Sequence, residues 1–133
     1  MPTAGYSGTP LVRKLGVKPG MTLALLRAPA GFRRELVGLP DDVAVRTRAS
    51  GRPDLVVWFV DRRRDLERDV ARMARLMGHG LWIAWPKQAS GVITDVTGDV
   101  VRTTGLRHGL VDYKVCAIND TWSGLKFARR ADG

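Results

Sequence analysis

Cysteine and histidine are scarce in this sequence. It contains one cysteine, Cys116, and two histidines, His79 and His108. A single cysteine can form neither an internal disulfide bond nor a zinc site built on cysteines. With so few histidines a histidine-rich metal site is not expected either, so the sequence predicts no metal centre.

Long hydrophobic runs are also missing. No apolar stretch approaches the roughly 18 residues that a membrane-spanning helix requires, so we expect no membrane as a partner. The first six residues lack the charged and apolar regions of a signal peptide, and this favours a cytoplasmic protein.

The composition that remains is that of one folded domain. The chain has 133 residues, of which 44% are hydrophobic and 26% are charged, so it is long enough to bury a core and too apolar to be disordered. We therefore expect a single domain over residues 1–133. Glycine and proline recur within residues 1–20, which we interpret as a covering arm with one short helix at residues 11–15.

Strand and helix patterns alternate along the rest of the chain. This order is typical of an α/β fold with a mostly parallel sheet of about six strands and helices on both faces. The final two strands, on either side of residues 119–121, are expected to form an antiparallel hairpin. The predicted strands cover residues 21–27, 43–47, 54–60, 81–85, 110–118 and 122–129.

Two long helices are expected. Leu66, Val70 and Met73 recur at helical spacing after Asp61, whose carboxylate can cap the first turn of a helix, and Gly78 and Gly80 end that helix. The other long helix is predicted over residues 93–106, with Ile93, Val96, Val100 and Thr104 facing inward.

The sequence is strongly basic, with a formal net charge of +9. Such a charge makes a nucleic acid a possible partner. However, the arginines of residues 62–75 alternate with acids such as Asp65 and Asp69, which is the pattern of a solvated helix face. Nucleic-acid binding is therefore an alternative rather than the favoured interpretation, and genome composition could also explain the arginines.

The order of elements resembles that of class I S-adenosylmethionine-dependent methyltransferases, a Rossmann-like fold. Residues 15–21, 54–86 and 110–129 carry this resemblance, although one strand–helix unit of that fold has no counterpart. Further stretches resemble a bacterial family, domain-of-unknown-function family 3052. These stretches are Tyr6-Ser7-Gly8-Thr9-Pro10-Leu11, Lys14-Leu15-Gly16, Trp85-Pro86-Lys87, Ser90-Gly91, Asp112-Tyr113-Lys114-Val115-Cys116-Ala117 and Thr121-Trp122-Ser123-Gly124-Leu125-Lys126.

The cofactor motif of those methyltransferases is degenerate here. A glycine-rich turn should follow the first strand, but residues 27–32 contain only Gly31, together with Pro29, which has no backbone donor. An acid should follow the second strand, where this chain has Arg46 and Arg48. Since arginine cannot accept a hydrogen bond from a ribose hydroxyl, we expect no cofactor, and S-adenosylmethionine least of all.

A ligand site is nevertheless expected where the strands end, because open α/β sheets bind ligands there. Lys87 and Ser90 precede a predicted helix start, whose free N–H groups attract anions. Tyr6, Ser7 and Lys14 could form a lid over this crevice. The residues predicted to line the crevice are Arg27, Gly31, Asp61, Trp85, Lys87, Ser90 and Gly91.

These observations favour a non-catalytic module that binds a small anionic ligand or another protein. The alternatives are an enzyme acting on a small anionic substrate, a divergent methyltransferase, and a basic nucleic-acid-binding protein. No nucleophile with its base can be assembled: Cys116 lies within a predicted strand and is interpreted as a small buried residue.

Overall fold

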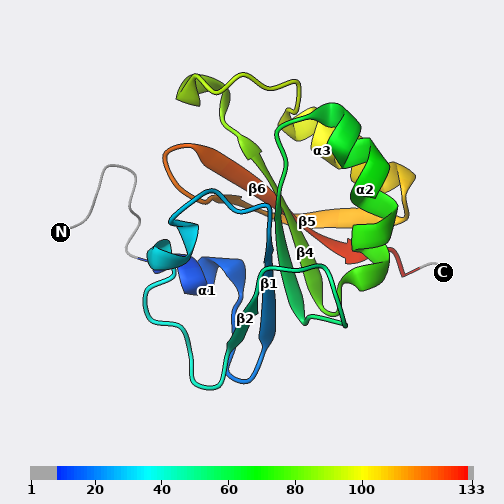
Figure 1. Ribbon diagram of the computed structural model, residues 1–133. Coiled ribbons are helices and arrows are strands. Elements are labelled where there is room, and N and C mark those ends of the chain that lie inside the picture. Colours follow the sequence, from blue (N-terminus) through cyan, green and yellow to red (C-terminus); the bar gives the residue numbers. More distant parts are fainter. Residues whose placement is uncertain (1–8, 132–133) are drawn as a thin grey trace.

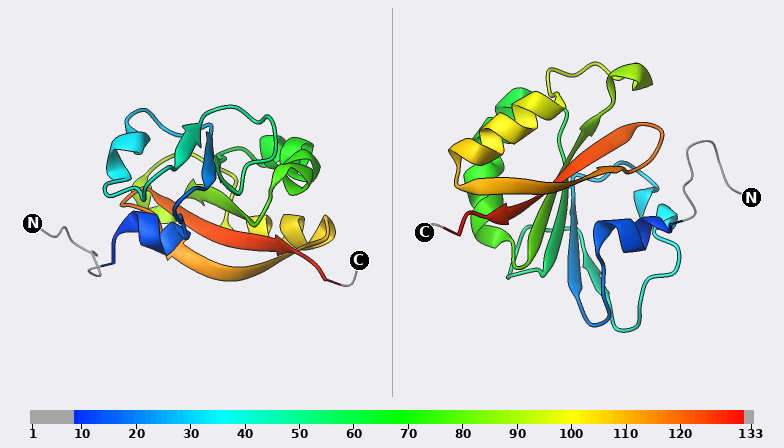
Figure 2. Two further views of the ribbon diagram at one scale, coloured as in Figure 1. Left: turned by 90° about the horizontal axis from the view of Figure 1, so that it is seen from below. Right: turned by 180° about the vertical axis from the view of Figure 1, so that it is seen from behind.

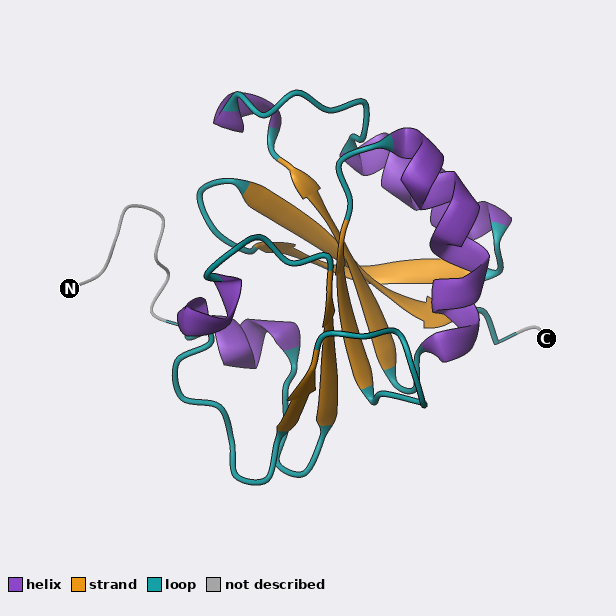
Figure 3. Ribbon diagram, in the orientation of Figure 1, coloured by secondary structure: helices purple, strands orange, loops and turns teal. Residues whose placement is uncertain are grey.

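A six-stranded sheet with helices on both faces forms the centre of the computed structural model, which describes residues 9–131 (Figures 1 and 3). The elements, in chain order, are α1 (Leu11–Leu15), β1 (Thr22–Leu26), the 3₁₀ helix η1 (Phe32–Glu35), β2 (Ala44–Arg46), β3 (Leu55–Phe59), α2 (Arg63–Leu76), β4 (Gly80–Pro86), the 3₁₀ helix η2 (Gln88–Ser90), α3 (Gly98–Arg107), β5 (Leu110–Ala117) and β6 (Trp122–Arg129).

The strands follow the order β2-β1-β3-β4-β6-β5. Neighbours among the first four are parallel, whereas β6 is antiparallel to both β4 and β5. The last strand of the chain is therefore inserted between two strands that run the other way. This confirms the predicted α/β class, the mostly parallel sheet and the C-terminal antiparallel hairpin.

The sheet separates two apolar layers. Helices α2 and α3 cover one face, and α1 and η1 lie against the other (Figures 1 and 2). β3 is buried along its whole length, as expected for a continuous apolar run in a parallel sheet. The largest fully buried side chains are Trp58, Trp82, Phe32, Phe59, Phe127, Leu15, Leu23, Leu55, Leu66, Met77, Leu81 and Ile83.

The short helix α1 is attached to the sheet through its last residue. The side chain of Leu15 is fully buried. Its carbonyl oxygen accepts hydrogen bonds from Trp82 Nε1 at 2.9 Å and from Lys126 Nζ at 3.2 Å. Helices of this length are marginal in isolation, so these contacts to β4 and β6 explain why the chain keeps a helical turn here.

The start of α2 differs from the prediction, which made Asp61 its N-cap. The chain stays extended through Arg62, and no side chain of that cap residue binds the first turn. Instead, the carboxylate of Asp95 accepts a hydrogen bond from the backbone N–H of Arg63 at 2.7 Å. The acceptor thus comes from 32 residues further along the chain, where local spacing could not reveal it.

The predicted start of α3, at residue 93, is also wrong. Residues 91–97 form a loop in which the side chain of Ile93 is 96% exposed. The helix begins at Gly98, and the hydroxyl of Thr97 caps it by accepting a hydrogen bond from the N–H of Val100. Ile93 and Val96 suggested helical periodicity, but threonine as a cap and the adjacent glycine mark the true start.

The end of α2 is fixed by a close backbone approach. Gly78 and Gly80 follow the helix as predicted, yet neither adopts the left-handed conformation expected of a glycine cap. The N–H of Gly78 donates to the carbonyl of Pro53, and a Cβ atom on Gly78 would lie only 2.9 Å from that oxygen. Glycine is required here for lack of space.

Two further findings concern residues 9–131 alone. No helix in this part of the chain combines the length and the apolar character that crossing a bilayer would require. Nor do three or more histidine, cysteine, aspartate or glutamate side chains gather there in a way that could hold a metal ion.

Candidate functional site

The strand order changes direction at the junction of β1 and β3. β2 lies on one side of β1, whereas β3 and β4 lie on the other. In open α/β sheets such a reversal leaves a crevice beyond the carboxyl ends of the strands, and ligands bind there. In this chain the loops at that end comprise residues 27–31, 60–62, 87–97 and 118–121, along the upper edge of the sheet in Figure 1. We call these loops the C-terminal edge.

The loop after β1 forms an open elbow. Arg27 and Gly31 both adopt left-handed backbone conformations, with φ of 57° and 82°. Apart from its chain neighbours, no residue of the described range 9–131 has an atom within 4 Å of a Cβ atom built on Gly31, so a ligand can approach the backbone here. The guanidinium of Arg27 lies 3.7 Å from the carboxylate of Asp65 on α2, which ties the elbow to the adjacent helix.

An aromatic cluster lies beneath this elbow. The rings of Phe32 and Phe59 meet edge to face with their centroids 4.8 Å apart, and Trp122 lies against Phe59 at 5.1 Å. These rings come from η1, β3 and β6. On the outer side, Asn119 Nδ2 donates a hydrogen bond to Glu35 Oε1 at 2.9 Å. The helix η1, which follows the elbow, and the turn between β5 and β6 are thereby fixed to each other.

The loop after β3 is fastened to the loop before α3. Thr94 Oγ1 donates a hydrogen bond to the carbonyl oxygen of Asp61 at 2.7 Å. Asp61 follows the end of β3, and within residues 9–131 its carboxylate has no hydrogen-bond or ion-pair partner. Its acceptor atoms are therefore left for a ligand, directly beyond the end of β3.

Lys87 and Ser90 are used partly within their own loop. The hydroxyl of Ser90 donates to the carbonyl of Lys87 at 2.6 Å and accepts from the N–H of Val92. Gly91 follows in a left-handed conformation, and α3 begins only seven residues later, at Gly98. The anion site at these residues stays a prediction, and it lacks the helix start that was expected to support it.

The predicted lid can be followed only through Lys14. Tyr6 and Ser7 lie outside the described residues. Lys14 belongs to α1. Its positive charge, like that of Lys87, lowers the pKa of the Cys116 thiol at the end of β5. Burial raises the pKa of the Cys116 thiol, and the nearby lysines only partly oppose that shift, which fits the interpretation of a buried core cysteine.

A pocket that the sequence did not reveal opens beside β4. It has a volume of about 260 Å³. Trp85 is the predicted site residue that contributes to it, and a Cβ atom on Gly98 would lie 3.1 Å from the Trp85 ring. A helix predicted over residues 93–106 concealed the loop that closes the pocket. Its lining residues are Trp85, Pro86, Gln88, Val92, Thr94, Val96, Thr97 and Gly98.

Comparison with solved structures shows the same fold in methyltransferases. Magnesium protoporphyrin IX methyltransferase from Synechocystis PCC 6803, solved with bound S-adenosylmethionine, is 11% identical over 90% of this chain and 74% of its own, with a TM-score of 0.62. A putative type 11 methyltransferase from Sulfolobus solfataricus is also 11% identical, over 91% of this chain and 90% of its own, with a TM-score of 0.60. No protein-family model matches the chain, and no curated protein matches it.

These structures correct the expectation that S-adenosylmethionine would not bind. The Synechocystis enzyme was also solved with bound S-adenosylhomocysteine, with a TM-score of 0.59 to this chain. A fold that this chain shares therefore holds the cofactor in two structures. The single glycine of the elbow and Arg46 at the end of β2 are departures from the usual pattern, and they are not grounds for excluding the cofactor.

Proposed function

We propose that this chain is a divergent methyltransferase whose C-terminal edge binds S-adenosylmethionine. The observation that carries the proposal is the insertion of the antiparallel strand β6 between β4 and β5, on a sheet that reverses its order at β1 and β3. The solved methyltransferases that match this fold include one with S-adenosylmethionine and one with S-adenosylhomocysteine.

The residues at the C-terminal edge fit S-adenosylmethionine in part. The left-handed, uncrowded backbone at Gly31 allows the nucleoside of the cofactor to approach the chain closely. The usual acid at the end of β2 is replaced by Arg46, so the ribose hydroxyls need another acceptor. We assign that role to Asp61, because its carboxylate is partly exposed beyond the end of β3. When bound, S-adenosylmethionine would supply a methyl group activated by its sulfonium.

The chain's own contribution is to position and shield ligands. The buried aromatic rings of Phe32 and Phe59 make the floor under the elbow rigid, so the backbone at Gly31 is held in place before a ligand arrives. The pocket at Trp85 offers a second concave space at the same edge. We propose that this pocket receives a small acceptor molecule, since most of its polar groups are uncharged amide and hydroxyl groups.

The resemblance to domain-of-unknown-function family 3052 agrees with this location. Its stretches 85–87, 90–91 and 121–126 include much of the loop after β4 and the start of β6, which border the C-terminal edge. We propose membership of that family on this basis. A non-catalytic binding module remains the alternative, and methyl transfer from labelled S-adenosylmethionine would distinguish the two.

Titration calorimetry with S-adenosylhomocysteine tests the proposed site. Gly31→Leu should abolish binding, because its side chain fills the space in front of the elbow. Gly20→Leu is the matched control. Gly20 precedes β1 at the other end of the strand and has a φ of 78°, and within residues 9–131 a Cβ built on it would also meet no atom within 4 Å. Both variants carry the same left-handed strain, about 1–2 kcal/mol, so only the site differs.

Asp61→Ala provides a second test of the same site. Loss of a charged acceptor for the ribose should weaken binding about tenfold or more, since hydrogen bonds to charged groups contribute roughly 1.5–3 kcal/mol. Asp41→Ala removes the same charge from an exposed position before β2 and should leave affinity unchanged. Absence of binding by the unaltered protein at millimolar S-adenosylhomocysteine would refute the proposal.

A further inference from the structure

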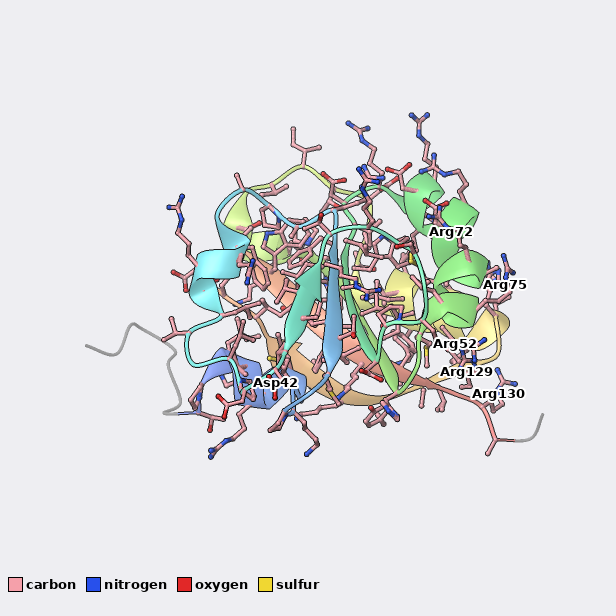
Figure 4. The ribbon with its side chains drawn as sticks, turned by 60° about the horizontal axis from the view of Figure 1, so that its bottom comes forward. Asp42, Arg52, Arg72, Arg75, Arg129 and Arg130 are labelled. Carbon is pink, nitrogen blue, oxygen red and sulfur yellow. The ribbon has the colours of Figure 1, made fainter. Side chains whose placement is uncertain are left out.

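A basic groove lies where α2, α3 and β6 end, away from the C-terminal edge (Figure 4). It has a volume of about 410 Å³. Among the residues that the structure describes, three arginines and one histidine line it, and no aspartate or glutamate does. The lining residues are Ala71, Ala74, Arg75, His108, Gly109, Leu110, Arg129 and Arg130.

Two of these arginines neutralise helix ends. Arg129 Nη2 donates to the carbonyl oxygens of Ala74 and Met77 at 2.8 and 2.7 Å, at the end of α2. Arg130 donates to the carbonyl of Leu106 near the end of α3. A helix C-terminus carries only about half a negative charge, so each full guanidinium charge leaves the groove positive rather than neutral.

The charges of α2 are divided along its length. The first half, residues 63–69, has three arginines and three acids, so its charges balance. Arg63 pairs with Glu67 at 3.1 Å, and Arg68 pairs with Asp65 and Asp69, whereas Arg64 has no ion-pair partner within residues 9–131. In the second half, Arg72 and Arg75 are exposed one turn apart and have no acidic partner within residues 9–131. The positive charge of this helix is therefore concentrated at the end that borders the groove.

A fifth arginine extends the surface. Arg52 precedes Pro53, whose carbonyl accepts the N–H of Gly78 just beyond α2, and Arg129 binds the carbonyl of Met77 at the same place. Figure 4 shows Arg52, Arg72, Arg75, Arg129 and Arg130 along one side of the molecule. Segments distant in sequence thus contribute to one surface.

We propose that this basic groove binds the phosphate backbone of a double-stranded nucleic acid. Arginine forms bidentate contacts with phosphate, and a long polyanion exploits the net charge of +9. Among residues 9–131, no phenylalanine, tyrosine or tryptophan lines the groove, so it lacks both the large aromatic anchors typical of a protein interface and the large aromatic rings on which unpaired bases usually stack. The duplex is therefore the partner that the chemistry favours.

This inference is independent of methyl transfer. The groove lies where α2 and α3 end, whereas the C-terminal edge lies near where α2 begins. The two ligands are proposed to bind different surfaces and are titrated separately, so a negative result for one does not contradict the proposal for the other.

Fluorescence anisotropy with labelled 20-base-pair duplexes of DNA and of RNA tests the proposal. The double variant Arg72→Gln/Arg75→Gln should weaken binding to at least one duplex by tenfold or more at about 0.1 M salt. Its slope of log K against log salt should fall by about two, because each phosphate contact contributes about 0.9 to that slope. Arg129 is left unchanged, since it also caps α2.

The control is Arg33→Gln/Arg34→Gln, which removes the same two charges from exposed positions on η1. It should retain most of the affinity, and both variants should keep the thermal unfolding temperature of the parent. No binding of either duplex at 50 mM salt would overturn the proposal, as would equal losses in the two variants. Tighter binding of the single strand, or of poly-L-glutamate, would also overturn it.

Discussion

At the scale of single residues, burial and hydrogen-bond partners decide whether a side chain is available to react or to bind a ligand. Cys116 is the one thiol of the chain, and its position inside β5 is the reason it is not a candidate nucleophile. The interpretation of Cys116 as a small buried residue followed from its apolar strand context alone. By contrast, the carboxylate of Asp61, which has no partner within the described residues, could not be deduced, because the sequence favoured Asp61 as a helix cap.

Cys116 should react slowly while the protein is folded. Burial raises the pKa of its thiol above the usual 9.0, so less thiolate, which is the reactive form, is present at pH 8. Ellman's reagent at pH 8 should therefore modify the folded protein at least about tenfold more slowly than the protein in denaturant. Equal rates in the two states would contradict this account.

The same pKa shift has a consequence for stability. The folded state holds the thiol proton more tightly than the unfolded state, so the free energy of unfolding should fall as the pH rises through about 9. Urea denaturation of Cys116→Ala should show a smaller decrease between pH 8.5 and pH 10.5 than the parent shows.

At the scale of elements, the strongest local patterns were sufficient to predict where a helix or strand begins and ends, and the weaker patterns were not. α1 and β6 have the predicted bounds, because Leu11–Leu15 and Trp122–Arg129 are each followed or preceded by clear turn residues. The start of α3 was misplaced by five residues. There the side chain of Asp95 binds the first residue of α2, and that of Thr94 binds the carbonyl of Asp61 in the loop before it. Such non-local hydrogen bonds produce no local periodicity in the sequence.

Asp95 should stabilise α2 although it lies outside that helix. Asp95→Ala removes the acceptor of the Arg63 N–H and should lower the free energy of unfolding by about 1 kcal/mol, the usual effect of losing a cap. Asp95→Asn retains an acceptor oxygen and should cost only a few tenths of that amount. Urea denaturation of the two variants measures both effects, and an unchanged stability of Asp95→Ala would refute the capping role.

At the scale of the whole molecule, the sequence predicted the layers and the class of sheet, but the order of its strands depends on pairing between distant segments. The hairpin of β5 and β6 was expected, whereas the pairing of β6 with β4 follows from no short motif. The basic groove was hidden for the same reason. Arg72 and Arg75 differ from other arginines of α2 because the acids of this helix pair near its start, and the sequence alone does not show which arginines those acids bind.

The same scale explains why the sequence wrongly excluded the cofactor. The glycines after β1 and the acid after β2 form only a short motif, whereas the arrangement of six strands involves the whole chain. In the Synechocystis enzyme, which is 11% identical to this chain, the shared fold holds S-adenosylmethionine. The elbow at Gly31 has an open backbone with a single glycine, and the crystallographic test below asks whether that is enough for the nucleoside to approach.

A crystal structure grown with S-adenosylhomocysteine tests the central claim most directly. We predict density for the nucleoside beyond the ends of β1 and β3, with its ribose hydroxyls within hydrogen-bond distance of the Asp61 carboxylate and its body against the backbone of Gly31. Nucleoside density elsewhere on the molecule, or none at millimolar ligand in crystals that leave this edge accessible, would contradict the account.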